Sequence, residues 1–206
     1  MTVRRSGPMP LMAVLTMVAI WMGCSKPGDE NLSALNEAKR NVDTGLATLD
    51  HWNVDSTKAV RERVSEKFKD LDWLMADSSL TFGVDEGQII GNWVRARRYL
   101  KNAPERITVL GNEGRLCASQ LQNLIQAINS QATEDANGTP MDEAYFQRES
   151  KREIEAVSQW RAAVSETDRM VQLGVDLEQS TRVAVDSLIR AKRAEWAQNI
   201  ANPPIE

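Results

Sequence analysis

Small and apolar residues recur every three or four positions through the middle of the chain, from Ile89 to Ile128. The spacing alternates between four and three without a slip, which is the heptad pattern of helices that pack along one another. This pattern predicts an all-α fold with coiled-coil character. Its members are Ile89, Trp93, Ala96, Leu100, Ala103, Ile107, Leu110, Gly114, Cys117, Leu121, Leu124 and Ile128.

Pro104 lies inside this heptad pattern. A proline removes one backbone hydrogen bond and clashes with the preceding turn, which costs ~3 kcal/mol in a helix interior. The pattern nevertheless continues in phase on both sides of the proline. The sequence therefore favours one helix that is kinked at Pro104 over two independent helices.

Similar spacing predicts two helices before this one, over residues 31–51 and 56–76. After it, Thr139 and Pro140 provide a helix-start signal, because threonine caps a helix and proline suits its first position. The helix that begins there can continue to about Ile200. At 1.5 Å per residue, its roughly 60 residues would span ~90 Å.

Helices joined by short connections usually pack as antiparallel neighbours. We therefore expect an elongated antiparallel helical bundle over residues 31–200, with about four helices, of which the third is kinked and the fourth is very long. Residues 201–206, which contain two prolines, form a C-terminal tail in this prediction.

The charge balance limits the classes of partner. The chain has 25 basic and 29 acidic residues, for a net charge of −4, and without Arg4 and Arg5 this becomes −6. Nucleic-acid binding requires a basic face, so we expect no nucleic-acid partner.

The first residues differ in character from the rest. Two arginines precede an unbroken apolar run over residues 10–22, which is about the length of a signal-peptide core. A helix needs ~20 apolar residues to cross a bilayer, and this run is shorter. Gly23 and Cys24 end the run, and polar residues follow at once. We therefore expect a signal peptide over residues 1–23, followed by a flexible tether over residues 24–30.

The apolar run that ends in Gly23–Cys24 resembles the lipobox of bacterial lipoproteins. The resemblance implies a diacylglycerol on the Cys24 sulfur, cleavage before Cys24 and anchoring in the cell envelope. Ser25, in place of aspartate, implies the outer membrane. Trp21 departs from the leucine that the family prefers, and an ordinary signal peptide or an uncleaved transmembrane helix are the alternatives.

The rest of the chain resembles, in its layout over residues 55–189, a group of uncharacterised helical putative lipoproteins of the Bacteroidota. The shared features are a DST helix start, a basic stretch that ends at Lys101–Asn102, and the segment QLQNL over residues 120–124 before a polar loop and a long last helix. This resemblance implies a location and a fold, and it implies no functional residues.

The sequence offers little for catalysis. His51 is the only histidine, and no CxxC or HExxH spacing that could bind a metal occurs. Cys117 occupies a heptad position, so we expect it to be a buried apolar side chain instead of a nucleophile. We predict no catalytic, cofactor-binding or metal-binding residues, and no enzyme.

Two features are candidates for contact with a partner. Trp73 lies off the main apolar face of its predicted helix, and the stretch RARRYLK carries Arg95, Arg97, Arg98 and Lys101. A solvated face is the first interpretation of this basic stretch, and a site for anionic lipid or an acidic partner is the second.

The leading hypothesis is a lipid-anchored envelope protein whose bundle binds another envelope protein, or a second copy of itself, or acts as a spacer. The alternative is a bundle that binds a lipid or a small ligand.

Overall fold

The structure is a computed structural model, and it describes residues 26–201. The predicted signal peptide, Cys24 and residues 202–206 lie outside this range. Within the range the chain is all-α, as predicted. It forms a short 3-10 helix, η1, followed by α1 to α5, with the bounds Asp29–Asn31 (η1), Leu32–Asp50 (α1), Val54–Met75 (α2), Val84–Leu100 (α3), Ala103–Ser130 (α4) and Glu143–Ala201 (α5).

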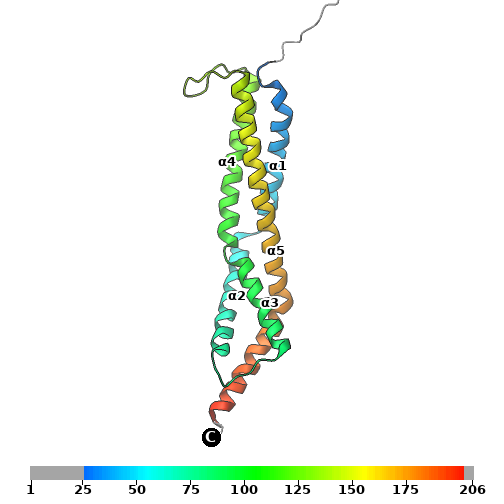
Figure 1. The fold of residues 1–206 in the computed structure, drawn as a ribbon, viewed down its shortest axis with the longest axis vertical. Coiled ribbons are helices and arrows are strands. Elements are labelled where there is room, and N and C mark those ends of the chain that lie inside the picture. The colour runs from blue at the N-terminus through cyan, green and yellow to red at the C-terminus, as the bar shows by residue number, and fades with distance from the viewer. Residues whose placement is uncertain (1–25, 202–206) are drawn as a thin grey trace, which may run out of the picture.

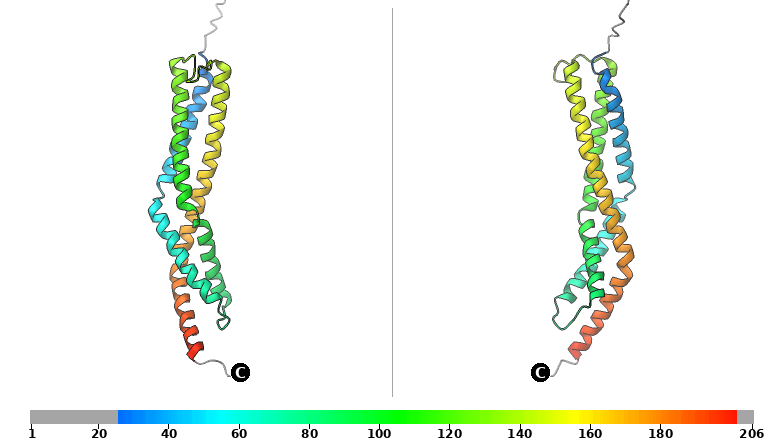
Figure 2. Two further views of the ribbon diagram at one scale, coloured as in Figure 1. Left: turned by 90° about the vertical axis from the view of Figure 1, so that its left-hand side faces the viewer. Right: turned by 45° about the vertical axis from the view of Figure 1, so that its right-hand side comes forward.

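The helices form an elongated bundle with three arms (Figure 1). The first arm consists of α1 and α2, which follow one another end to end. The second arm, α3 and α4, returns in the opposite direction, and α5 then runs the whole length without a break. One half of the bundle contains α1, α4 and α5, and the other half contains α2, α3 and α5. Figure 2 shows this division from two further sides. We call the half with α1 the proximal half and the half with α2 the distal half.

The first arm runs parallel to α5. Trp52 donates a hydrogen bond to Asp168, 116 residues further along the chain, and Arg193 donates one to Asp70, which precedes it by 123 residues. Between these two contacts, Arg63 of α2 donates to Glu178, 115 residues further along, so both helices of the first arm keep a similar register on α5.

The second arm differs from the prediction in one detail. Lys101 and Asn102 separate α3 from α4, so the expected kinked helix is two helices. Pro104 lies in the first turn of α4, where a helix makes no use of the N–H that proline lacks. The two helices still face α5 in one antiparallel register, since Leu100 in α3 lies against Gly174 and Arg106 in α4 reaches Met170, four residues earlier in α5.

Most heptad residues of the second arm are buried, as the pattern requires. Ile89 is an exception, because Ile90 takes the buried place beside it. In the proximal half, the indole of Trp160 packs between Gly45 of α1 and Gly114 of α4, and a Cβ on either glycine would collide with it. These two glycines therefore allow α1 and α4 to pack closely against α5.

Candidate functional site

The chain enters the bundle at the end where α4 and α5 are joined, which we call the anchor end (Figure 1). Gly28 has a φ of 81°, in the left-handed region, and its N–H donates to the Glu143 carboxylate over 2.7 Å. A Cβ at Gly28 would lie 2.9 Å from side-chain atoms of Ile128 and Phe146. Only glycine fits this position, both in conformation and in space. The predicted tether is therefore docked on the bundle from Gly28 onward, whereas Lys26 and Pro27 before it are exposed.

The loop between α4 and α5 completes the anchor end. Gln147 of α5 donates to Glu30 over 2.8 Å, which ties η1 to α5. A groove of about 350 Å³ lies between the entering chain and this loop. Its apolar lining comes from Pro27, Ala132, Pro140, Met141 and Phe146.

Trp73 lies near the other end of the bundle, in the last turn of α2. Its side chain is 48% exposed, and its ring meets the ring of Trp196 edge to face, with centroids 5.0 Å apart. Trp196 in turn donates to Asp77 over 2.9 Å. Hydrogen bonds from the Ser79 side chain and backbone, and then from Trp196, lower the pKa of Asp77. We call Trp73 and Trp196 the distal tryptophan pair.

The sequence analysis did not identify Trp196 as a candidate residue. The spacing of four residues from Leu188 to Lys192 and from Lys192 to Trp196 was the available signal. Beside the pair, a depression of about 370 Å³ is lined by Asp70, Trp73, Arg193, Trp196 and Ala197.

Of the four basic residues of the RARRYLK stretch, Arg98 and Lys101 line one small pocket, whereas Arg95 and Arg97 are not part of it. Arg95 donates to Asn92 on its own helix, and Arg97 stacks over the ring of Phe68 at 4.2 Å. Arg98 and Lys101 are exposed. Lys101 also lies at the far end of α3 from the distal tryptophan pair, so the predicted partner residues form separate features of the surface.

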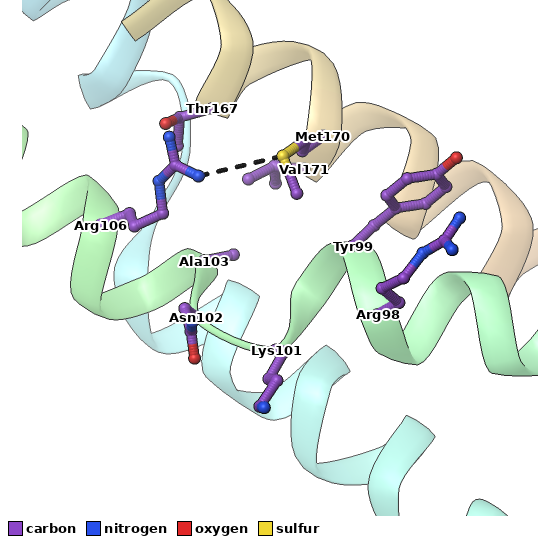
Figure 3. A pocket seen from close by; sticks show the side chains of 9 residues that line it. All are labelled: Arg98, Tyr99, Lys101, Asn102, Ala103, Arg106, Thr167, Met170 and Val171. Atoms are coloured by element: carbon purple, nitrogen blue, oxygen red, sulfur yellow. Dashed lines mark hydrogen bonds between the residues drawn. The ribbon is translucent and has the colours of Figure 1, made fainter. Parts of the chain in front are cut away.

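A small pocket lies at the level where the second arm is interrupted (Figure 3). Arg106 points across it toward Met170, whereas Lys101 points away from both. The pocket has a volume of about 80 Å³, and typical ligand pockets have ~300 Å³ or more. It therefore holds at most a few atoms. Its lining residues are Arg98, Tyr99, Lys101, Asn102, Ala103, Arg106, Thr167, Met170 and Val171.

The buried charges of the distal half are already paired. Glu178 of α5 is 1% exposed and accepts a hydrogen bond from Arg63 of α2 over 3.0 Å. Lys192 donates to Glu195 and to the carbonyl of Thr81. The hydrogen bond to Glu195 is the main cause of its raised pKa. Through these contacts Glu178 ties α5 to α2, and Lys192 ties α5 to the loop before α3.

His51 and Cys117 are the two remaining residues that the sequence analysis considered for chemistry. His51 is exposed and lies edge to face with Trp52. Cys117 is half-buried, whereas its place in the heptad pattern predicted a buried side chain. Burial raises the pKa of the Cys117 thiol, and the charges of Glu153 and Glu113 raise it further. A raised pKa disfavours the reactive thiolate.

Residues 26–201 contain no group of three or more His, Cys, Asp or Glu side chains that could hold a metal ion. Among the same residues, no helix combines the length and the apolar character that crossing a membrane requires.

The chain was compared with known proteins at three levels. No protein-family model, no curated protein and no solved structure matches it. The geometry of the described residues and the N-terminal sequence are therefore the basis for a functional hypothesis.

Proposed function

We propose that this chain is a lipid-anchored protein of the bacterial cell envelope, whose bundle holds a protein-binding end at a fixed distance from the membrane. One observation carries the proposal. The chain docks on the bundle at Gly28, four residues after Cys24, and α5 then runs for 59 residues from that end to the other. At 1.5 Å per residue this is a rod of ~90 Å.

The N-terminal sequence supplies the anchor in this proposal. A single acyl chain binds a membrane only marginally, and two or three give durable attachment, because each buried CH₂ contributes ~0.8 kcal/mol. A diacylglycerol on the Cys24 sulfur would meet this requirement. Ser25 after the cysteine favours the outer membrane as the location.

The distal tryptophan pair is the best candidate for contact with a partner protein. Tryptophan is enriched where protein interfaces carry most of their binding energy. Trp73 is large, half-exposed and held in place by Trp196.

Binding of a lipid or a small ligand is the less supported function. Its sequence basis was the basic stretch, whose arginines lie apart, and the pocket beside that stretch holds only about 80 Å³.

Labelling of cells with a palmitate analogue tests the proposal. The wild type and a Cys117→Ala control should incorporate the label, and Cys24→Ala should not. Fractionation should then recover the labelled protein with the outer membrane. Equal labelling of the wild type and Cys24→Ala would contradict the proposal.

A further inference from the structure

The small pocket at the interruption of the second arm has a basic lining (Figure 3). Of its nine lining residues, Arg98, Lys101 and Arg106 are basic, and none is acidic. The chain as a whole has the opposite balance, with a net charge of −4. A lining of one sign raises the local concentration of ions of the other sign, so this pocket attracts anions.

Arg106 is the central group of the lining. It is half-buried near the start of α4, and Figure 3 shows its guanidinium pointing across the pocket. Its hydrogen bond goes to the sulfur of Met170, over 4.0 Å. A thioether sulfur is a weak acceptor, whereas a guanidinium presents a planar fork of N–H groups that suits phosphate and carboxylate oxygens. Among the described residues, Arg106 therefore has no acceptor of matching strength.

The carboxylates beside the pocket are engaged by other arginines. Glu105, the neighbour of Arg106 in the chain, accepts a hydrogen bond from Arg61 of α2. Glu166 accepts two from Arg169, over 2.9 and 2.8 Å. These bonds are the main cause of the lowered pKa of Glu166, and the charge of Arg106 contributes to it. Neither carboxylate lines the pocket, so neither takes the place of an anion there.

The volume of the pocket suits a small ion. A single water molecule needs ~10–15 Å³ of free volume, so about 80 Å³ has room for the five non-hydrogen atoms of a phosphate. Ala103, the first residue of α4, also lines the pocket, but Pro104 after it has no N–H to donate. The donors are therefore side chains and not the end of a helix.

We propose that this pocket binds a small tetrahedral oxyanion of the phosphate class, with Arg106 as its main ligand. Two N–H groups of the guanidinium bond two oxygens of the anion, in the bidentate arrangement typical of arginine. Only the weak contact with Met170 is lost. Arg98 and Lys101 are exposed and add positive charge at the rim. A free phosphate ion and the phosphate group of a small ester share this chemistry. The site is independent of the proposed anchoring at Cys24.

Thermal unfolding of the full chain in a non-ionic detergent tests the site. Saturating phosphate is compared with chloride at the same pH and ionic strength. Phosphate also stabilises proteins by exclusion from their surface, and Arg106→Gln should keep this general effect. The wild type should gain about 2–4 °C more than Arg106→Gln, because the ligand binds only the folded state.

Arg115→Gln is the matched control for the loss of an arginine. Arg115 is exposed further along α4, where it donates to Asn112, and it does not line the pocket. This variant should respond to phosphate as the wild type does. An equal gain in the wild type and Arg106→Gln, or an equal loss of the gain in both variants, would overturn the inference.

The methyl group of Met170 gives a local readout in the wild type, which does not require a variant to fold. Its magnetic resonance signal is the one that disappears in Met170→Leu. It should shift saturably as phosphate is added, whereas the signal of Met75, exposed at the end of α2, should not. An unmoved Met170 signal would overturn the inference. A parallel titration with glycerol phosphate assigns the source: a saturable shift supports the phosphate group of an ester, and a response to phosphate alone supports the free ion.

Discussion

Gly114 of α4 lies directly against the indole of Trp160 in α5: a Cβ at Gly114 would be 2.5 Å from Cζ2 of the ring. The indole N–H of Trp160 donates to the carbonyl of Leu110, one turn earlier in α4, over 2.8 Å. Contact and hydrogen bond together fix how far apart the two helices lie and how they are aligned along their length.

Gly114→Ala should therefore destabilise the bundle. Overpacking of a filled core costs ~1–3 kcal/mol, and the better helix propensity of alanine returns at most ~1 kcal/mol. We expect a net loss of about 1–2 kcal/mol in the free energy of unfolding, measured with urea. Gly91→Ala is the matched control, since nothing lies within 4 Å of a Cβ there, and it should gain up to ~1 kcal/mol. Equal effects of the two substitutions would contradict the packing described for Trp160.

Pro104→Ala should have little effect, because the first turn of α4 needs no N–H at that position. A loss of up to ~1 kcal/mol is expected from the greater freedom of the unfolded chain. Val109→Pro, at an exposed site inside α4, should instead cost ~3 kcal/mol or more. Circular dichroism and urea denaturation measure both. A gain near 3 kcal/mol for Pro104→Ala would mean that the proline strains a helix interior.

Arg63 and Glu178 should behave as a coupled pair. Arg63→Leu leaves the buried carboxylate with only Arg182, at 3.8 Å, and should destabilise the protein by ~1–3 kcal/mol, because an unsatisfied buried polar group is costly. Glu178→Leu combined with Arg63→Leu should recover most of the loss, since apolar replacement of a buried ion pair is often neutral. A double variant that is as unstable as the sum of the single variants would show that the pair is not coupled.

The thiol of Cys117 should make stability fall at alkaline pH. Its pKa is raised in the folded protein, so the unfolded chain loses this proton first. The contribution to stability is fully present below the ordinary thiol pKa of 9.0 and is lost as the pH rises through the folded value. Thermal unfolding at a series of pH values checks this, and Cys117→Ala should flatten the decline. With Cys24 blocked, native Cys117 should react with thiol reagents more slowly than the unfolded chain does, and fast labelling of native Cys117 below neutral pH would contradict this description.

The heptad pattern predicted the helical class and the packing of the second arm, because both depend on which face meets α5. The break at Asn102 could not be predicted in this way. Leu100 and Ala103 keep their places against α5 on both sides of it, so the pattern shows no slip. The break depends on the backbone of Asn102, with φ −117° and ψ 15°, and apolar spacing carries no signal for these angles.

Residues whose role depends on another arm were the hardest to predict. The burial of Glu178 could not be predicted from its own helix, because its partner Arg63 lies 115 residues earlier. The docking of Gly28 depends on Phe146 and Ile128, which belong to two different helices. The exposure of Trp73 could be predicted, because it depends only on the apolar pattern of the helix that contains it.

The interruptions of the two shorter arms have a mechanical consequence. Trp52, which lies between α1 and α2, donates a hydrogen bond to Asp168 of α5. Asn102, between α3 and α4, lies beside Thr167 and Met170 of α5. Both interruptions therefore lie at the same level of α5. A beam bends most easily where the fewest of its members are continuous, and at this level only α5 is continuous. A sideways load on the distal end would concentrate its bending moment there, so the stiffness of the whole strut depends on about two turns of a single helix.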